Sequence, residues 1–131
     1  MSDTITEKLE LDHQDVFKLK LGQCFDDTNG HQQSVDSLPI RDCTQPHDHE
    51  IYHIFNVNLD SYNDEEIEQQ ANARCEEAFQ RFTQKNYNES IYEMSYLSPS
   101  VESWQAQDRE VICYIQHPDQ KTTGSLRNIQ A

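Results

Sequence analysis

Three histidines and a cysteine lie close together between residues 43 and 55, and they are the side chains best suited to chemistry. His47 and His49 are two positions apart, and His53 follows four residues later. A strand advances about 3.3 Å per residue, so an extended chain would place the Cα atoms of His47 and His49 roughly 6.6 Å apart on one face. Both rings could then reach one metal ion. The spacing therefore allows a site for zinc or another divalent metal at His47, His49 and His53.

The same histidines also have a simpler interpretation. In a straight strand His53 would lie roughly 13 Å beyond His49, too far to join it without a bend. Pro46 favours a bend before the strand instead. Zinc sites need three or four ligands, so Asp48, Glu50 or a distant group would have to complete the site. Histidines in a turn or an edge strand can equally bond to backbone or water, and both interpretations stay open.

The four cysteines favour disulfide bonds over a metal site. Cys24, Cys43, Cys75 and Cys113 form an even, widely spaced set without a CxxC pair, whereas zinc sites usually pair their cysteines closely. Three connectivities are possible, and we favour Cys24–Cys43 with Cys75–Cys113. Each bond would stabilise the fold by roughly 3–4 kcal/mol. The alternative is four buried free thiols in a cytoplasmic protein.

The composition excludes several classes of partner. The 131 residues carry a formal net charge of −14, and 34% of them are hydrophobic. Such acidity would repel nucleic acid phosphates and anionic membrane surfaces. No run of 18 apolar residues is present, so we expect no direct membrane insertion. The polar N-terminus lacks the features of a signal peptide, so either the protein stays in the cytoplasm or its leader or anchor is absent from this sequence.

Hydrophobic patterning predicts an α+β fold. Alternation indicates strands at 16–21, 33–42, 50–57, 91–97 and 110–115. A hairpin from the first strand through the turn at Gly30 would bring Cys24 towards Cys43. We expect a small antiparallel sheet of about five strands, one main helix of about residues 64–83 on one face, and two disulfides.

The main helix has clear signals at its start and along one face. Asn63 can cap it, and Glu66 stands three residues later, as in a capping box. Apolar residues from Ile67 to Phe82 recur at spacings of three and four, and Cys75 belongs to this stripe. The helix should therefore bury the Cys75 sulfur against the sheet.

We expect one domain, residues 15–117. Residues 1–14 are predicted to be a flexible N-terminal arm. Residues 118–131, which begin with Pro118 and are rich in polar residues, are predicted to be a flexible C-terminal tail.

Five motifs, in order along the chain, resemble the septum formation family over roughly residues 16–116. They are Leu21-Gly-Gln-Cys24-Phe25, Cys43-x-x-Pro46-His47-x-x-Glu50, Arg74-Cys75-x-x-Ala78-Phe79, Tyr96-x-x-Pro99-x-x-x-x-Trp104 and Asp108-Arg109-x-x-x-Cys113. The resemblance implies an exported, disulfide-bearing domain of bacterial envelope proteins, associated by name with cell division. It implies no catalytic mechanism. His47 and Glu50 belong to the family pattern, as binding residues or as a structural hydrogen bond beside Cys43, whereas His49 and His53 do not.

The favoured function is a non-catalytic, extracytoplasmic domain, in the periplasm or at the cell surface, that binds a protein or cell-wall partner. Large aromatic side chains often dominate binding surfaces. The expected contact residues are His47, Glu50, Tyr96 and Trp104, with Tyr52, Tyr62, Tyr87 and Tyr92 as further aromatic candidates. For Trp104 the alternative is packing in the core.

The competing hypothesis is a metal-binding or hydrolytic protein that uses His47, His49, Glu50 and His53. No GxSxG, HExxH or glycine-rich phosphate loop supports it. The chain has only three glycines, so we expect no nucleotide, and no other cofactor is indicated.

Overall fold

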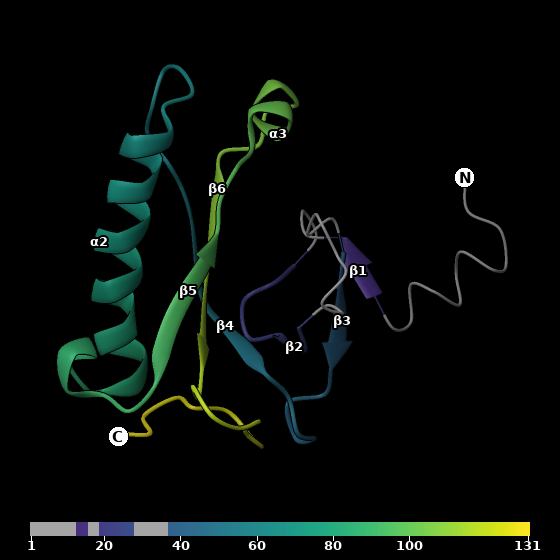
Figure 1. The fold of residues 1–131 in the computed structure, drawn as a ribbon, viewed down its shortest axis with the longest axis vertical. Helices are drawn as coiled ribbons and strands as arrows, with labels where there is room; N and C mark the ends of the chain where they lie inside the picture. The colour runs from purple at the N-terminus through teal and green to yellow at the C-terminus, as the bar shows by residue number, and fades with distance from the viewer. Residues whose placement is uncertain (1–12, 16–18, 28–36) are drawn as a thin grey trace, which may run out of the picture.

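The domain is an antiparallel sheet with one long helix packed against one face (Figure 1). A computed structural model describes residues 13–15, 19–27 and 37–131. In these ranges the sheet has six strands in the order β1-β3-β2-β4-β6-β5. The elements are β1 (His13–Asp15), β2 (Cys24–Phe25), β3 (Ser37–Arg41), β4 (His49–Asn56), α2 (Asp64–Thr83), η2 (Tyr87–Glu89), β5 (Glu93–Leu97), α3 (Val101–Gln105) and β6 (Glu110–Gln116). The predicted fold class is confirmed.

Helix α2 forms where its cap and its apolar stripe predict it. The Asn63 side chain accepts a hydrogen bond from the Glu66 backbone N–H at 3.0 Å, which satisfies one of the free donors of the first turn. At the other end Gln84 adopts the left-handed conformation and closes the helix. The predicted stripe is buried in full: Ile67, Ala71, Cys75, Ala78, Phe79 and Phe82. These residues pack against β4, β5 and β6.

Both disulfide bonds have the predicted connectivity. Cys75 of α2 is bonded to Cys113 of β6, and both residues are fully buried in the core beneath the helix. Cys24 lies opposite Arg41 in the β2–β3 pair, which brings Cys43 within reach of it. One bond therefore joins the helix to the sheet, and the other joins β2 to the loop after β3.

Apolar residues are buried on both faces of the sheet. The larger cluster lies between the sheet and α2 and includes Trp104. A second cluster, on the opposite face, contains Leu19, Phe25, Leu38, Ile51 and Ile112. The sheet is thus a central layer, and its two faces place different side chains in different surroundings.

The strand predicted at 16–21 is not found in the part of it that the structure describes. Residues 19–21 lead into a turn instead, because the Lys20 carbonyl accepts a hydrogen bond from the Gln23 N–H at 3.1 Å. Gly22 occupies this turn at φ +89°, a conformation that favours glycine. The hairpin that carries Cys24 is therefore formed by β2 and β3. Its predicted turn at Gly30 lies outside the described residues.

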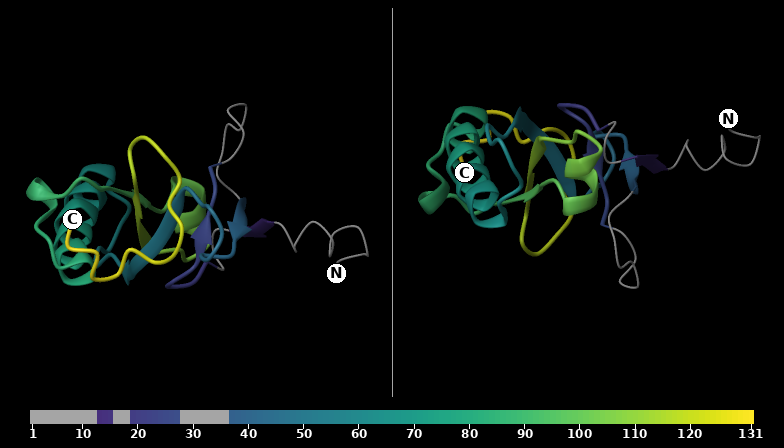
Figure 2. Two further views of the ribbon diagram at one scale, coloured as in Figure 1. Left: turned by 90° about the horizontal axis from the view of Figure 1, so that it is seen from below. Right: turned by 90° about the horizontal axis from the view of Figure 1, so that it is seen from above.

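The segment after Pro118, predicted to be a flexible tail, makes specific contacts. His47 and Thr122 exchange two backbone hydrogen bonds of 2.9 Å. Further on, Asn128 donates to the Phe82 carbonyl at 2.8 Å, at the end of α2. Figure 2 shows the segment running from the end of β6 back to α2, where the C-terminus lies.

In the described ranges no helix is both long and apolar enough to cross a bilayer.

The two disulfides should contribute unequally to stability. Replacing both partners of the core bond (Cys75→Ala/Cys113→Ala) should lower the free energy of unfolding by about 4 kcal/mol, against about 3 kcal/mol for Cys24→Ala/Cys43→Ala, because the core bond closes the longer loop, 38 against 19 residues. Urea denaturation of the two variants and the wild type measures the difference. The reverse order would contradict this account of the helix–sheet crosslink.

Candidate functional site

A β-bulge in β4 places His49 and His53 on different faces of the sheet. Ile51 lies opposite Tyr114 of β6, and His53 lies opposite the very next residue, Cys113, so Tyr52 is an extra residue without a partner. A bulge of this kind inverts the alternation of side chains beyond it. His49 therefore faces the second cluster, whereas His53 faces α2.

The alternation of a regular strand, which would put His49 and His53 on one face, is therefore interrupted between them. His53 stacks on Phe55, and burial together with the nearby Arg81 and Arg74 lowers its pKa. The ring is therefore neutral at neutral pH. In the described ranges no group of three His, Cys, Asp or Glu side chains is placed to hold a metal ion.

His47 holds the C-terminal segment in place. Its side chain is fully buried. The ring Nδ1 lies 2.9 Å from the Gln45 carbonyl oxygen, and Nε2 lies 3.3 Å from the Thr122 Oγ1. Both nitrogens are therefore occupied by groups of the domain itself, and His47 has no surface for a partner.

Glu50 is a second buried anchor for the same segment. Its carboxylate is 3% exposed and accepts hydrogen bonds from the Ser125 hydroxyl at 2.6 Å and the Leu126 N–H at 2.8 Å. Leu126 in turn fills part of the core beneath α2. Glu50 therefore fixes the segment by the backbone of Leu126 and by the side chain of Ser125.

His49 has the best geometry for acid–base chemistry, but its ring is fully engaged. Nε2 pairs with the Asp27 carboxylate, and Nδ1 lies 3.3 Å from the Gln116 Oε1. Phe25 and Tyr114 enclose the ring. No free ring nitrogen faces the adjacent recess of 490 Å³.

The recess beside His49 also lacks a hydroxyl or thiol nucleophile. The lining residues include no Ser, Thr or Cys. Lys121 is held in ion pairs with Asp26 at 3.0 Å and Asp48 at 3.2 Å. Burial raises the pKa of Asp26, but hydrogen bonds from Lys121 and the Asp48 N–H outweigh it, and the pKa is lowered. This ion-paired cluster joins the C-terminal segment to Asp26, which follows β2, and to Asp48, which precedes β4.

Trp104 and Tyr96, two of the expected contact residues, are largely covered. Trp104 is buried in the core. The Arg109 guanidinium lies 3.5 Å from the centre of its ring, and Tyr62 meets it edge-on. Tyr96 is partly buried, and burial followed by the charges of Glu68 and Asp64 raises its pKa. Trp104 is thus packed in the core, which is the alternative to a binding role that its sequence position left open.

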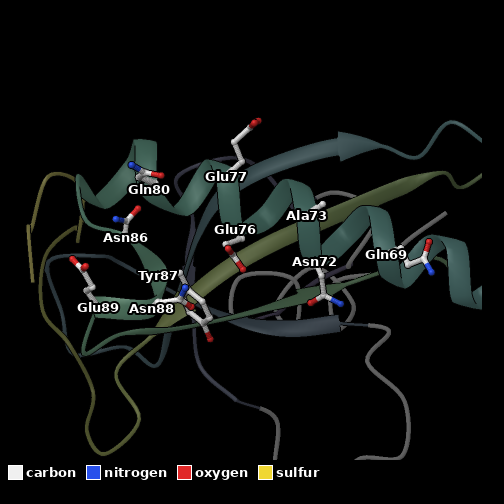
Figure 3. Close-up of a pocket in the computed structure, with 10 residues that line it drawn as sticks. All are labelled: Gln69, Asn72, Ala73, Glu76, Glu77, Gln80, Asn86, Tyr87, Asn88 and Glu89. Carbon is white, nitrogen blue, oxygen red and sulfur yellow. The ribbon is translucent and has the colours of Figure 1, made fainter.

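A groove lies on the surface between α2 and η2 (Figure 3). Its volume is about 870 Å³. We call it the α2–η2 groove, and its lining consists of Gln69, Asn72, Ala73, Glu76, Glu77, Gln80, Asn86, Tyr87, Asn88 and Glu89. Five amides and three carboxylates dominate, and the lining contains no lysine, arginine or histidine.

Tyr87 joins the groove to the core. Its ring packs edge-on against Phe79 at 5.0 Å between centroids, so the position of η2 depends on the buried face of α2. In Figure 3 Asn72 and Glu76 point from α2 towards the side on which Tyr87 lies, whereas Glu77 points away. Glu77 pairs with Arg81 at 3.0 Å.

Several polar groups of the groove are unpaired within the described part of the chain. Neither Glu76 nor Glu89 has an ion pair there, and the Gln69 side chain has no hydrogen bond. Exposed polar groups of this kind exchange water for a ligand at low cost, because no internal bond must break. These side chains are therefore free to contact a ligand in the groove.

Sequence reasoning found only part of this groove. Tyr87 was among the expected aromatic contacts, but the remaining lining was not singled out. The available signal was the stripe Gln69, Asn72, Glu76 and Gln80, at spacings of three and four beside the buried stripe. Such a pattern is typical of any solvent-exposed helix face, and only the neighbouring η2 makes this face one wall of a groove.

Comparison with known proteins gives one family. A family model described as "Septum formation" matches residues 21–131, most of the chain. No curated protein and no solved structure gives a significant match.

The Glu50 anchor predicts how the C-terminal segment can be released. Glu50→Ala removes the acceptor of two hydrogen bonds, so the free energy of unfolding should fall by about 2–4 kcal/mol. Hydrogen exchange at the Leu126 amide should rise before that of the β4 and β6 amides. Asp60→Ala, at an exposed loop position, is the control and should leave both unchanged. Unaltered exchange at Leu126 in Glu50→Ala would refute the anchoring role.

Proposed function

Because the chain belongs to the septum formation family, we propose that it is a non-catalytic, extracytoplasmic domain that binds a component of the bacterial cell envelope through the α2–η2 groove. The observation that carries the proposal is the groove itself, which combines a hollow of about 870 Å³ with unpaired carboxylates and amides. Ligand sites are concave and are usually formed in advance. The family is associated by its name with septum formation, and it is not a known enzyme family.

Two disulfides support a location outside the cytoplasm. Both bonds are formed, and no free cysteine remains. Structural disulfides form and persist in oxidising compartments and are rare in the reducing cytoplasm. An extracytoplasmic domain would meet cell-wall polymers and the exposed parts of envelope proteins.

The arrangement of the polar residues supports binding over catalysis. His47 and Glu50 are buried and bonded to the domain's own C-terminal segment. His49 has both ring nitrogens engaged. General acid–base work needs a group within reach of a substrate proton, and these three residues do not offer one.

Cosedimentation with isolated cell envelopes tests the proposal. The wild-type domain should sediment with the envelopes, and Glu76→Lys/Glu89→Lys should reduce the bound fraction about tenfold or more, because it reverses both unpaired charges of the groove. Asp60→Lys/Glu68→Lys changes the net charge equally at exposed positions outside the groove and is the matched control.

The control variant should bind like the wild type. Equal losses in both variants would mean that overall charge, not the groove, governs binding. No sedimentation of the wild type, or undiminished sedimentation of the groove variant, would overturn the proposal. Circular dichroism of each variant verifies that the fold is retained.

A further inference from the structure

We infer that the α2–η2 groove binds a glycan that carries free amino groups. The inference rests on the proposed function, since it names the occupant of the same groove. The groove's lining, its charge and its volume each bear on the identity of that occupant.

The lining favours a polar polymer over a folded protein surface. Ala73 is its single aliphatic residue, and Tyr87 its single aromatic one. Protein interfaces concentrate their binding energy in well-packed apolar and aromatic anchors that fit matching pockets. The groove offers no apolar pocket for such an anchor, so a protein partner would bury little there.

Planar amides are suited to sugar hydroxyl groups. Each Asn or Gln side chain has two N–H donors and a carbonyl acceptor in one plane, so it can pair with two neighbouring hydroxyls that donate and accept in turn. The groove presents five such amides on its two walls, Gln69, Asn72 and Gln80 from α2 and Asn86 and Asn88 from the η2 side. Tyr87, partly buried on Phe79, supplies a firmly held ring against which a sugar face can pack.

The charge of the groove selects the glycan further. Of its three carboxylates, Glu77 pairs with Arg81, whereas Glu76 and Glu89 have no cationic partner in the described ranges, and the whole chain carries a net charge of −14. An anionic polymer would be repelled, whereas ammonium groups would pair with Glu76 and Glu89. The ligand should therefore be a glycan with unacetylated amino sugars.

The size of the groove fits an oligosaccharide. Pockets of about 300–1,000 Å³ bury most of a drug-sized ligand, and this groove, at about 870 Å³, lies near the upper end of that range. It is open along the helix, as Figure 3 shows, with Gln69 at one end and Gln80 and Glu89 towards the other. A linear chain of several sugar rings can lie along it.

Calorimetric titration with a glucosamine hexasaccharide tests the inference on the intact chain. The wild type should bind the hexasaccharide, and Glu76→Gln should weaken binding about tenfold or more, since it removes one ammonium–carboxylate pair. Glu68→Gln removes the same charge from the same helix outside the groove and should bind like the wild type. Thermal unfolding of both variants verifies that they fold.

Two further ligands separate the alternatives. The N-acetylglucosamine hexasaccharide should bind at least about tenfold more weakly, and equal binding would overturn the requirement for amino groups. A lysine hexapeptide should also bind more weakly, and equal or tighter binding would overturn the glycan in favour of a basic peptide. Absence of hexasaccharide binding overturns this inference alone, whereas groove-dependent envelope sedimentation would still uphold the proposed function.

Discussion

The covalent bond between Cys75 and Cys113 is the constraint on which the arrangement of α2 depends. It lies fully buried in the middle of the helix's apolar stripe and joins that stripe to β6. The outer side of the helix is rich in acidic residues, and a net charge of −14 makes the compact state repel itself. With 34% hydrophobic residues the core is small for such a charge. The bond offsets this deficit and fixes where the exposed face of α2 points.

A series of contacts leads from that bond to the groove. Tyr52 donates to the Cys75 carbonyl at 2.6 Å and packs against Phe79, and Phe79 in turn contacts Tyr87 of η2. Burial, followed by the charges of Tyr87 and Glu76, strongly raises the pKa of Tyr52, so its hydroxyl remains a donor. Both walls of the groove therefore pack against the same buried rings, those of Tyr52 and Phe79, and this shared support gives the groove a fixed shape.

On the other side of the domain, buried polar groups serve the chain itself. His47 and Glu50, which belong to the family pattern, bind the segment that follows β6. The same segment donates from Gly124 to the Cys43 carbonyl at 2.6 Å, beside the second disulfide. These partners are 75 or more residues apart in sequence, so their contacts are non-local and close the domain. The chain has few apolar residues that could make the same connection by hydrophobic packing.

The sequence was informative where the cause of structure is local. Asn63, Glu66 and the stripe around Cys75 define α2, and the helix fixed one disulfide while the β2–β3 hairpin allowed the other. The sequence did not predict features that depend on residues far apart in the chain or on a single inserted residue. Nothing in the residues around Tyr52 marks the bulge that separates His49 from His53.

The C-terminal segment shows the same limit, because its order depends on Glu50, far away in the sequence. The groove likewise exists only once η2 lies beside α2. A polar helix face and a polar loop have no distinguishing pattern when each is considered alone. Their juxtaposition is set by the packing of Tyr87 on Phe79, which spacing along the chain does not reveal.

The central claim is that the outer face of α2 and η2 forms the binding surface of this domain. Nuclear magnetic resonance of the ¹⁵N-labelled protein, titrated with the glucosamine hexasaccharide, maps the surface directly. The account predicts amide shift changes confined to residues 69–80 and 86–89, with the signals of His47, His49 and Glu50 unmoved. Changes centred on the recess beside His49, or no changes at saturating ligand, would contradict it.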